Sequence, residues 1–119
     1  ARTFDCLFIP GGPGVARLRA DPRVVPLVLR HHSAGSWITA ICAAPTVLQD
    51  AGLLAGKHFT AHFSVAAELP GMLSGERVVV DGRIITSRGA GTALDFGLEL
   101  VTALFSAEKK VEISRSVCA

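Results

Sequence analysis

Cys42 is the residue whose type and surroundings best fit covalent chemistry. It ends an apolar run, with Ala40 two residues before it and Ala43 and Ala44 directly after it. Small residues at these places are typical of a nucleophile elbow, because a sharp strand-to-helix turn brings the backbone close to neighbouring elements. At such a turn, unpaired amides and the helix dipole favour the thiolate. We therefore expect Cys42 to be a nucleophile; a small, inert core thiol is the alternative.

Two backbone amides are expected to face this sulfur. The N–H of Ala43 points into the space above the thiol in an elbow of this kind. Gly12 follows the apolar run 4–9, and ligands of α/β sheets bind beyond the carboxyl ends of such strands. Gly12 and Ala43 are thus candidate oxyanion donors. The glycine-rich turn 10–14 matches neither the P-loop nor the GxGxxG pattern, so we expect no nucleotide cofactor.

A thiol nucleophile needs a base, and His62 is the first candidate. It follows the apolar run 59–61 and should lie at the same sheet edge as Cys42. His58 precedes that run and is expected at the opposite end. His31 and His32 close a predicted helix, where a solvated cation suits the dipole. A structural role remains the alternative for His62.

The remaining reactive side chains point to no metal or disulfide. Arg88 follows a predicted strand and either binds an anionic substrate group or forms a structural ion pair, and we favour the structural role. Cys6 lies within an apolar run and is expected to be inert core, while Cys118 lies in a polar tail. Three cysteines without a CxxC or His/Cys pattern fit neither a disulfide framework nor zinc, so reduced thiols in the cytoplasm are expected.

Composition excludes several classes of protein. The chain has 119 residues, of which 50% are apolar and 18% charged, so it can build a core and is not a disordered segment. The net charge of +2 comes from scattered basic residues, which argues against a nucleic-acid binder. The longest run free of charge and His, residues 33–48, is too short and too broken to span a membrane.

The local patterns predict an α/β layered fold. Strands are expected over residues 4–9, 36–41 and 59–61, and in a hairpin over 77–86 that turns at Asp81-Gly82. Helices are expected over residues 22–32, 43–51 and 91–105, with an irregular or helical piece over 64–69. The last helix carries one narrow polar stripe, so most of its surface should be buried. This is little sheet for so much apolar helix surface.

Several segments together resemble the DJ-1/PfpI superfamily, and within it the DJ-1/YajL-like branch. The resemblance covers nearly the whole chain, and the elbow and the Thr-Ser-Arg-Gly block are specific in combination. The segments that carry it are residues 4–12, 40–46, 51–54, 60–62 and 81–92. The resemblance implies a flavodoxin-like parallel-sheet sandwich, of the class I glutamine amidotransferase-like type, that forms homodimers.

The resemblance also implies a role in oxidative and carbonyl stress defence. It implies glutathione-independent glyoxalase (lyase) or deglycase (hydrolase) chemistry on a small aldehyde or a glycated protein. The family's reactive cysteine falls on Cys42, its backbone donors on Gly12 and Ala43, and its active-site histidine on His62. A redox-sensing or chaperone-like dimer whose cysteine is oxidised to a sulfinate is the alternative, and a degenerate relative with an unreactive thiol is a third.

Two departures from the family pattern matter. The protease-like branch has His directly after the nucleophile, where this chain has Ala43, so peptidase activity is not expected. The family's first strand, first helix and cysteine-bonding glutamate have no counterpart here, and Glu68, Glu76 and Glu99 stand in the wrong segments to replace that glutamate. We therefore expect residues 1–119 to be the C-terminal part of one domain, completed by a separate or cleaved N-terminal segment.

Overall fold

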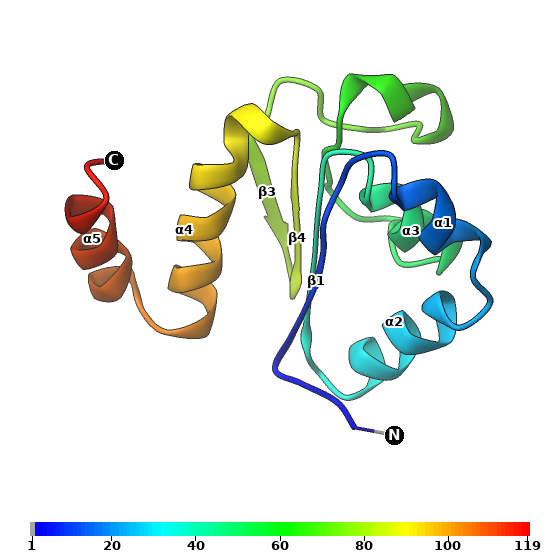
Figure 1. Ribbon diagram of the computed structural model, residues 1–119, viewed down its shortest axis with the longest axis horizontal. Helices are drawn as coiled ribbons and strands as arrows, with labels where there is room; N and C mark the ends of the chain where they lie inside the picture. Colours follow the sequence, from blue (N-terminus) through cyan, green and yellow to red (C-terminus); the bar gives the residue numbers. More distant parts are fainter. Residues whose placement is uncertain (1) are drawn as a thin grey trace.

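A four-stranded sheet lies at the centre of the computed structural model, which describes residues 2–119 and leaves Ala1 outside (Figure 1). The strand order is β1-β2-β4-β3. Neighbours β1, β2 and β4 are parallel, while β3 pairs antiparallel with β4. The strands are β1 (Cys6–Ile9), β2 (Trp37–Ile41), β3 (Val78–Asp81) and β4 (Ile84–Ser87). The expected α/β sandwich with a mainly parallel sheet is confirmed.

Helices cover both faces of the sheet, as a parallel sheet requires. Three of them pack on one face, α4 packs on the other, and α5 lies against α4 on the side away from the sheet (Figure 1). The α-helices are α1 (Val15–Ala20), α2 (Val24–Ser33), α3 (Pro45–Asp50), α4 (Ala93–Leu104) and α5 (Ala107–Ser116). Two short 3₁₀ segments, η1 (Phe63–Glu68) and η2 (Ala90–Thr92), flank the carboxyl edge of the sheet.

The core is concentrated on the α1–α3 face. Its fully buried members include Ile38, Leu48 and Leu69, and the loop residue Phe59 joins them. On the α4 face, the buried cluster consists of Ile41, Ile85 and Phe96.

Two sequence predictions about elements were wrong, and no helix was predicted for the C-terminal tail. Residues 59–61 are buried but form no strand, because the N–H of Thr60 donates to the side-chain hydroxyl of Thr86 (2.9 Å) rather than to a backbone carbonyl. The helix after the elbow begins at Pro45 and not at Ala43. The C-terminal tail forms the helix α5. The Ser106 hydroxyl caps this helix, because it accepts a hydrogen bond from the Lys109 N–H (3.0 Å).

The hairpin is confirmed, but its turn is shifted by one residue. Asp81 pairs with Ile84, so Gly82 and Arg83 form the two-residue loop. Only Gly82 has a positive φ (60°), whereas a type I′ turn needs positive φ at both central residues. The last long helix also differs from expectation, because Phe96 and Leu98 are the buried residues of α4 and Leu94 is half exposed.

No helix within residues 2–119 is long and apolar enough to cross a membrane.

Candidate active site

Cys42 lies in a turn between β2 and α3 and has a left-handed backbone conformation, with φ of 66°. A non-glycine residue in this region costs about 1–3 kcal/mol and persists only where neighbours fix it. Here the N–H of Cys42 donates to the carbonyl of Ser87 (3.0 Å), and its carbonyl accepts from the N–H of His62 (2.8 Å). The structure thus forms the elbow that the small residues predicted.

Gly11 lies directly against this elbow. A Cβ added to Gly11 would lie 2.5 Å from Cys42 Cβ, 2.9 Å from the carbonyl oxygen of Ile41 and 3.3 Å from Cys42 Sγ. Since two of these distances are shorter than real Cβ contacts, only glycine fits. Gly12 was the predicted site residue of this turn, and the role of Gly11 was not predicted. The pair of adjacent glycines was the available signal, because Gly11 must leave room for the elbow and Gly12 must adopt a positive φ.

The two amides expected as oxyanion donors are free to donate. Neither the N–H of Gly12 nor that of Ala43 donates to an acceptor within residues 2–119. Gly12 has a φ of 90°, which only glycine adopts readily. The N–H of Cys42 itself is already used by Ser87. The amides of Gly12, next to the contacting residue Gly11, and of Ala43, next to Cys42, therefore remain the candidate donors.

His62 is placed next to the elbow by its backbone, and its ring is oriented by the next turn. Its Nδ1 accepts from the N–H of Ser64 (3.2 Å) and lies 2.8 Å from the Ser64 hydroxyl. Because an amide can only donate, Nδ1 carries no proton and the neutral ring presents Nε2–H as a donor. The Phe63 ring lies against the imidazole, with centroids 4.2 Å apart. This geometry suits donation of a hydrogen bond from Nε2 to a substrate oxygen more than proton abstraction by that nitrogen.

Arg88 and His62 line one cavity of about 390 Å³. Its wall also includes Phe63, Arg77 and the residues 89–92 that lead into α4. Arg77 is held by Asp95 (Nε to Oδ2, 2.6 Å), whereas Arg88 forms no ion pair with a carboxylate of residues 2–119. Cys42 does not line this cavity. The structure thus brings the loop of Gly12 and the backbone of His62 to the elbow, while Arg88 shares a cavity with His62 that Cys42 does not line.

The residues next to Arg88 also fix the loop that lies beside the His62 ring. The buried hydroxyls of Ser87 and Thr92 lie 2.6 Å apart, and Thr92 Oγ1 accepts from the N–H of Gly89 (3.2 Å). This network fixes Gly89 so closely to His62 that an added Cβ would lie 3.3 Å from the ring. The Thr-Ser-Arg-Gly motif therefore shapes the loop beside the imidazole.

The other cysteines differ from Cys42. Cys6 lies on β1, where burial raises the pKa of its thiol, partly offset by a contact with Thr39 Oγ1 at 3.9 Å. This fits the expected inert core position. Cys118 is exposed near the C-terminus. All three thiols are free within the described chain.

No carboxylate of residues 2–119 hydrogen-bonds to Cys42. Glu68 binds Arg19, while Glu76 and Glu99 line a hollow between β3, α4 and α5. Among the described residues, no cluster of three His, Cys, Asp or Glu side chains is arranged to hold a metal ion.

One expectation about the histidines was wrong. His31 is 1% exposed, although a solvated helix end was expected, because its Nδ1 lies 2.9 Å from the Leu27 carbonyl and its Nε2 accepts from the Phe4 N–H (3.2 Å). His32 is exposed as expected. His58 binds the hairpin residue Asp81 through its N–H (2.7 Å), away from the elbow.

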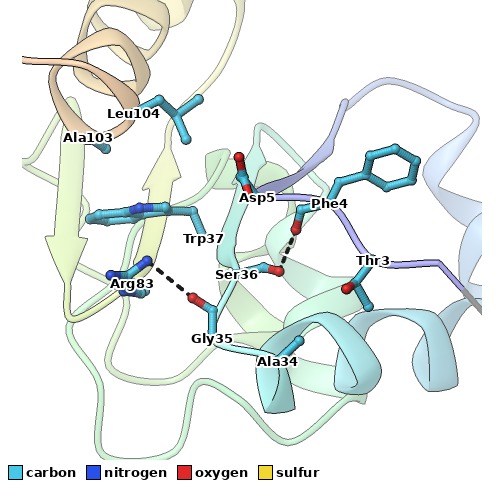
Figure 2. Close-up of a pocket in the computed structure, with 10 residues that line it drawn as sticks. All are labelled: Thr3, Phe4, Asp5, Ala34, Gly35, Ser36, Trp37, Arg83, Ala103 and Leu104. Atoms are coloured by element: carbon cyan, nitrogen blue, oxygen red, sulfur yellow. Dashed lines mark hydrogen bonds between the residues drawn. The ribbon is translucent and has the colours of Figure 1, made fainter.

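A second cavity, of about 360 Å³, lies at the opposite end of the sheet (Figure 2). Arg83 lies over the Trp37 ring and donates to the Gly35 carbonyl (3.1 Å), and Asp5 faces the same space. The cavity is lined by residues before β1 and β2, by the hairpin turn and by the end of α4. It is separate from Cys42, because the parallel strands have their amino ends here.

Comparison with known proteins identifies the relatives of this arrangement. Residues 1–103 match the model of the DJ-1/PfpI family. The chain is 37% identical to glutathione-independent glyoxalase DJR-1.2 of Caenorhabditis elegans, over 98% of this chain and 64% of that protein. It is 39% identical to protein dj-1beta of Drosophila melanogaster, over 96% of this chain and 63% of that protein.

The fold agrees equally well with solved structures. Oxidised Toxoplasma gondii DJ-1 superposes with a TM-score of 0.89 at 34% identity, covering 97% of this chain and 64% of the other. The chain therefore spans slightly less than two thirds of the length of the relatives it matches.

Proposed function

Because this chain belongs to the DJ-1/PfpI family, we propose that it acts in oxidative and carbonyl stress defence through glyoxalase- or deglycase-type chemistry on reactive aldehydes. The observation that carries the proposal is the left-handed backbone of Cys42, held between β4 and His62 beside the free amides of Gly12 and Ala43. Relatives named as glutathione-independent glyoxalases support the choice of substrate class. Ala43, in place of a histidine after the nucleophile, argues against peptidase activity.

The proposed first step is addition of the Cys42 thiolate to an aldehyde carbon. A C–S bond forms, and the electron pair of the carbonyl π bond moves to oxygen. The Gly12 and Ala43 amides and the His62 Nε2–H would donate hydrogen bonds to that oxyanion, and a proton from water would then give the hemithioacetal. A proton then moves from C1 to C2 of the adduct through an enediol, which gives a thioester of lactate. Water cleaves the C–S bond of that thioester and releases lactate and the Cys42 thiol. Arg88, beyond His62, is the proposed contact for an anionic substrate group, with a structural ion pair as the alternative.

Turnover of methylglyoxal by the purified protein, together with the N-terminal segment expected to complete its domain, tests this function. Cys42→Ser should lower kcat/KM by about a thousandfold or more, because the nucleophile is removed. The matched control is Cys118→Ser, an exposed thiol far along the chain, which should keep wild-type turnover. A Cys42→Ser protein that stays folded and still consumes methylglyoxal at the wild-type rate would refute the proposal.

We propose that residues 1–119 are the C-terminal part of one domain, with a complementing N-terminal segment of that domain as partner. Strand β1 is the edge of the sheet, and Phe8 on it is 50% exposed. Beside β1 lies an apolar hollow of about 150 Å³, lined by Leu7, Phe8, Ile9, Pro10, Leu18, Val24, Leu27 and Val28. A strand added here would pair with β1 and cover this surface. The same segment would supply the carboxylate that Cys42 lacks.

Homodimer formation and a cytoplasmic location are also proposed. The dimer follows from family membership, and the three free thiols suit a reducing compartment. Sedimentation of the purified protein tests the dimer: a single monomeric species at micromolar concentration would refute it.

A second candidate function is redox sensing or chaperone-like protection without turnover. The observation in its favour is that Cys42 is only half buried beside two free amides, which would bind a sulfinate oxygen as well as an oxyanion. Mild peroxide should then add two oxygens to Cys42 alone, as read by intact mass and peptide mapping. Equal oxidation of Cys6 and Cys118 would count against this function.

A further inference from the structure

Arg19 joins carboxylates from two other elements in a three-way ion-pair network. Its Nε and Nη2 donate to Asp50 Oδ2 and Oδ1, at 2.8 and 3.0 Å, and its Nη1 donates to Glu68 Oε1 at 2.8 Å. These hydrogen bonds, first to Asp50 and then to Glu68, raise the pKa of Arg19 above its ordinary value. Exposed single ion pairs contribute little, but a fork-like pair within a network is the exception.

The positions of the three residues connect this network to the site. Arg19 is next to last in α1, and Asp50 and Glu68 are the last residues of α3 and η1. Each of these six-residue elements begins shortly after one part of the site: α1 after Gly12, α3 after Cys42 and Ala43, and η1 directly after His62. The loop before α1 contacts the elbow through Gly11, and the residue before η1 contacts it through the His62 N–H, while the far ends of the three elements meet at the Arg19 guanidinium. Figure 1 shows α1 and α3 side by side.

The helix α3 is well anchored, with four of its six residues buried, but few apolar contacts hold α1 and η1 in place. Val15, the first residue of α1, is the buried residue of that helix. No residue of η1 is buried, although Val65 packs against the core and the next residue, Leu69, is buried. Rotation of η1 about Leu69 would move His62, and a shift of α1 would move Gly12. The network opposes both movements at the ends where apolar packing is thinnest.

We propose that Arg19 is a positioning residue, which fixes the Gly12 amide and the His62 imidazole relative to Cys42 by holding α1, α3 and η1 together. This inference rests on the proposed role of Cys42 as nucleophile. The two arms of the network act on different parts of the site. The Asp50 arm sets the spacing of the two oxyanion donors, and the Glu68 arm sets the orientation of His62.

Kinetics of methylglyoxal turnover provide the first test. Arg19→Ala should lower kcat about ten- to a hundredfold with little change in KM, because small misplacements of catalytic groups are costly. Arg19→Lys should restore part of the loss. Asp50→Asn should lower kcat equally at all pH values, whereas Glu68→Gln should change the pH profile of kcat. The control is Arg23→Ala, which removes an ion pair of similar length (2.7 Å) between Arg23 and Asp21, two residues apart in the sequence. This variant should change neither kcat nor KM.

A second measurement keeps the test independent of turnover. The NMR signals of the His62 ring, assigned with His62→Gln, should shift or broaden in Arg19→Ala and Glu68→Gln but not in Arg23→Ala. Wild-type kinetics in Arg19→Ala, or losses that match the loss of folded protein by circular dichroism, would overturn the proposal. If the wild-type protein shows no turnover, the proposed function fails, and unchanged His62 signals in Arg19→Ala would then overturn the positioning role as well.

Discussion

The two faces of the sheet differ in how much apolar surface they bury. On the α1–α3 face, thirteen residues form one buried cluster, whereas the buried cluster on the α4 face has three. The α4 side also exposes Phe8, Leu94 and Leu104 to solvent by 40–52%. The proposed nucleophile and its amide donors lie on loops that lead into α1 and α3. The proposed active site therefore lies on loops of the more tightly packed face, where close packing fixes the positions of the loops.

A leucine on each face should show this difference most strongly. Leu48→Ala in α3 removes a side chain with no exposed surface and should lower the free energy of unfolding by about 3–5 kcal/mol. Leu98→Ala in α4, at 8% exposed, should cost about 2 kcal/mol because Leu98 lies outside the buried cluster of Ile41, Ile85 and Phe96 and lines a cavity. Urea unfolding of both variants measures the two losses. Equal losses would show that the α4 face is as well consolidated as the other.

A methyl group at the junction of loop and elbow should have the next largest effect. Gly11→Ala places its Cβ 2.5 Å from Cys42 Cβ, so the loop must shift, at a cost of about 1–3 kcal/mol. The same shift should reduce methylglyoxal turnover about a hundredfold. Gly14→Ala is the matched control, because no atom lies within 4 Å of its added Cβ. Similar turnover in the two variants would mean that the loop does not define the site.

Adjacent residues of β1 offer a finer comparison, since they point to opposite faces. Ile9 is 6% exposed on the α1–α3 side, and Ile9→Ser should lower the free energy of unfolding by at least about 2 kcal/mol. Phe8→Ser should cost about 1 kcal/mol or less, because half of the Phe8 side chain is already exposed. The contact that it loses is with the ring of Phe96, at a centroid distance of 5.7 Å. Urea unfolding again decides. A larger loss for Phe8→Ser would reverse the ranking of the two faces.

The smallest effect is expected outside both faces, at the exposed pair of Asp21 and Arg23. Hydrogen bonds from Arg23 lower the pKa of Asp21 from 3.8 to about 2. Because the pKa of Asp21 is lower in the folded chain than in the unfolded chain, its carboxylate stabilises the fold at pH values above about 4. That stabilisation is lost as the pH falls from about 4 to about 2. Asp21→Asn should therefore be slightly less stable than wild type at pH 7 and equal to it near pH 2, by thermal unfolding. A deficit that grows in acid would contradict this sign.

The parts of the fold set by local chemistry were predictable from sequence. The apolar runs of β1 and β2, the β-branched hairpin and the stop of α3 at Gly52, with φ of 76°, all follow from periodicity or backbone preference. The path of residues 59–61 was not predictable, because it depends on the Thr86 hydroxyl from a strand distant in sequence. The burial of His31 likewise depends on the Phe4 N–H, a tertiary contact.

The candidate site divides in the same way. Cys42 was predicted because small residues around a thiol carry a local steric signal, and Gly12 because a parallel strand ends just before it. His62 was predicted from a strand over residues 59–61 that does not form, although its N–H still reaches the Cys42 carbonyl from a loop. Three features of the site could not be predicted from the sequence. They are the contact of Gly11 with the elbow, the hydrogen bond of the Cys42 N–H to Ser87, and the position of Arg88 in a cavity that Cys42 does not line. None of these leaves a periodic trace in the sequence.

The network around Arg19 has a consequence for how this chain tolerates changes in length. One residue added inside an α-helix turns everything beyond it by about 100°, and inside a 3₁₀ segment by about 120°. An insertion or deletion in α1, α3 or η1 would thus swing Arg19, Asp50 or Glu68 away from its partners. Indels should therefore be rarer in these three segments than in the loop around Gly75, which carries no such register.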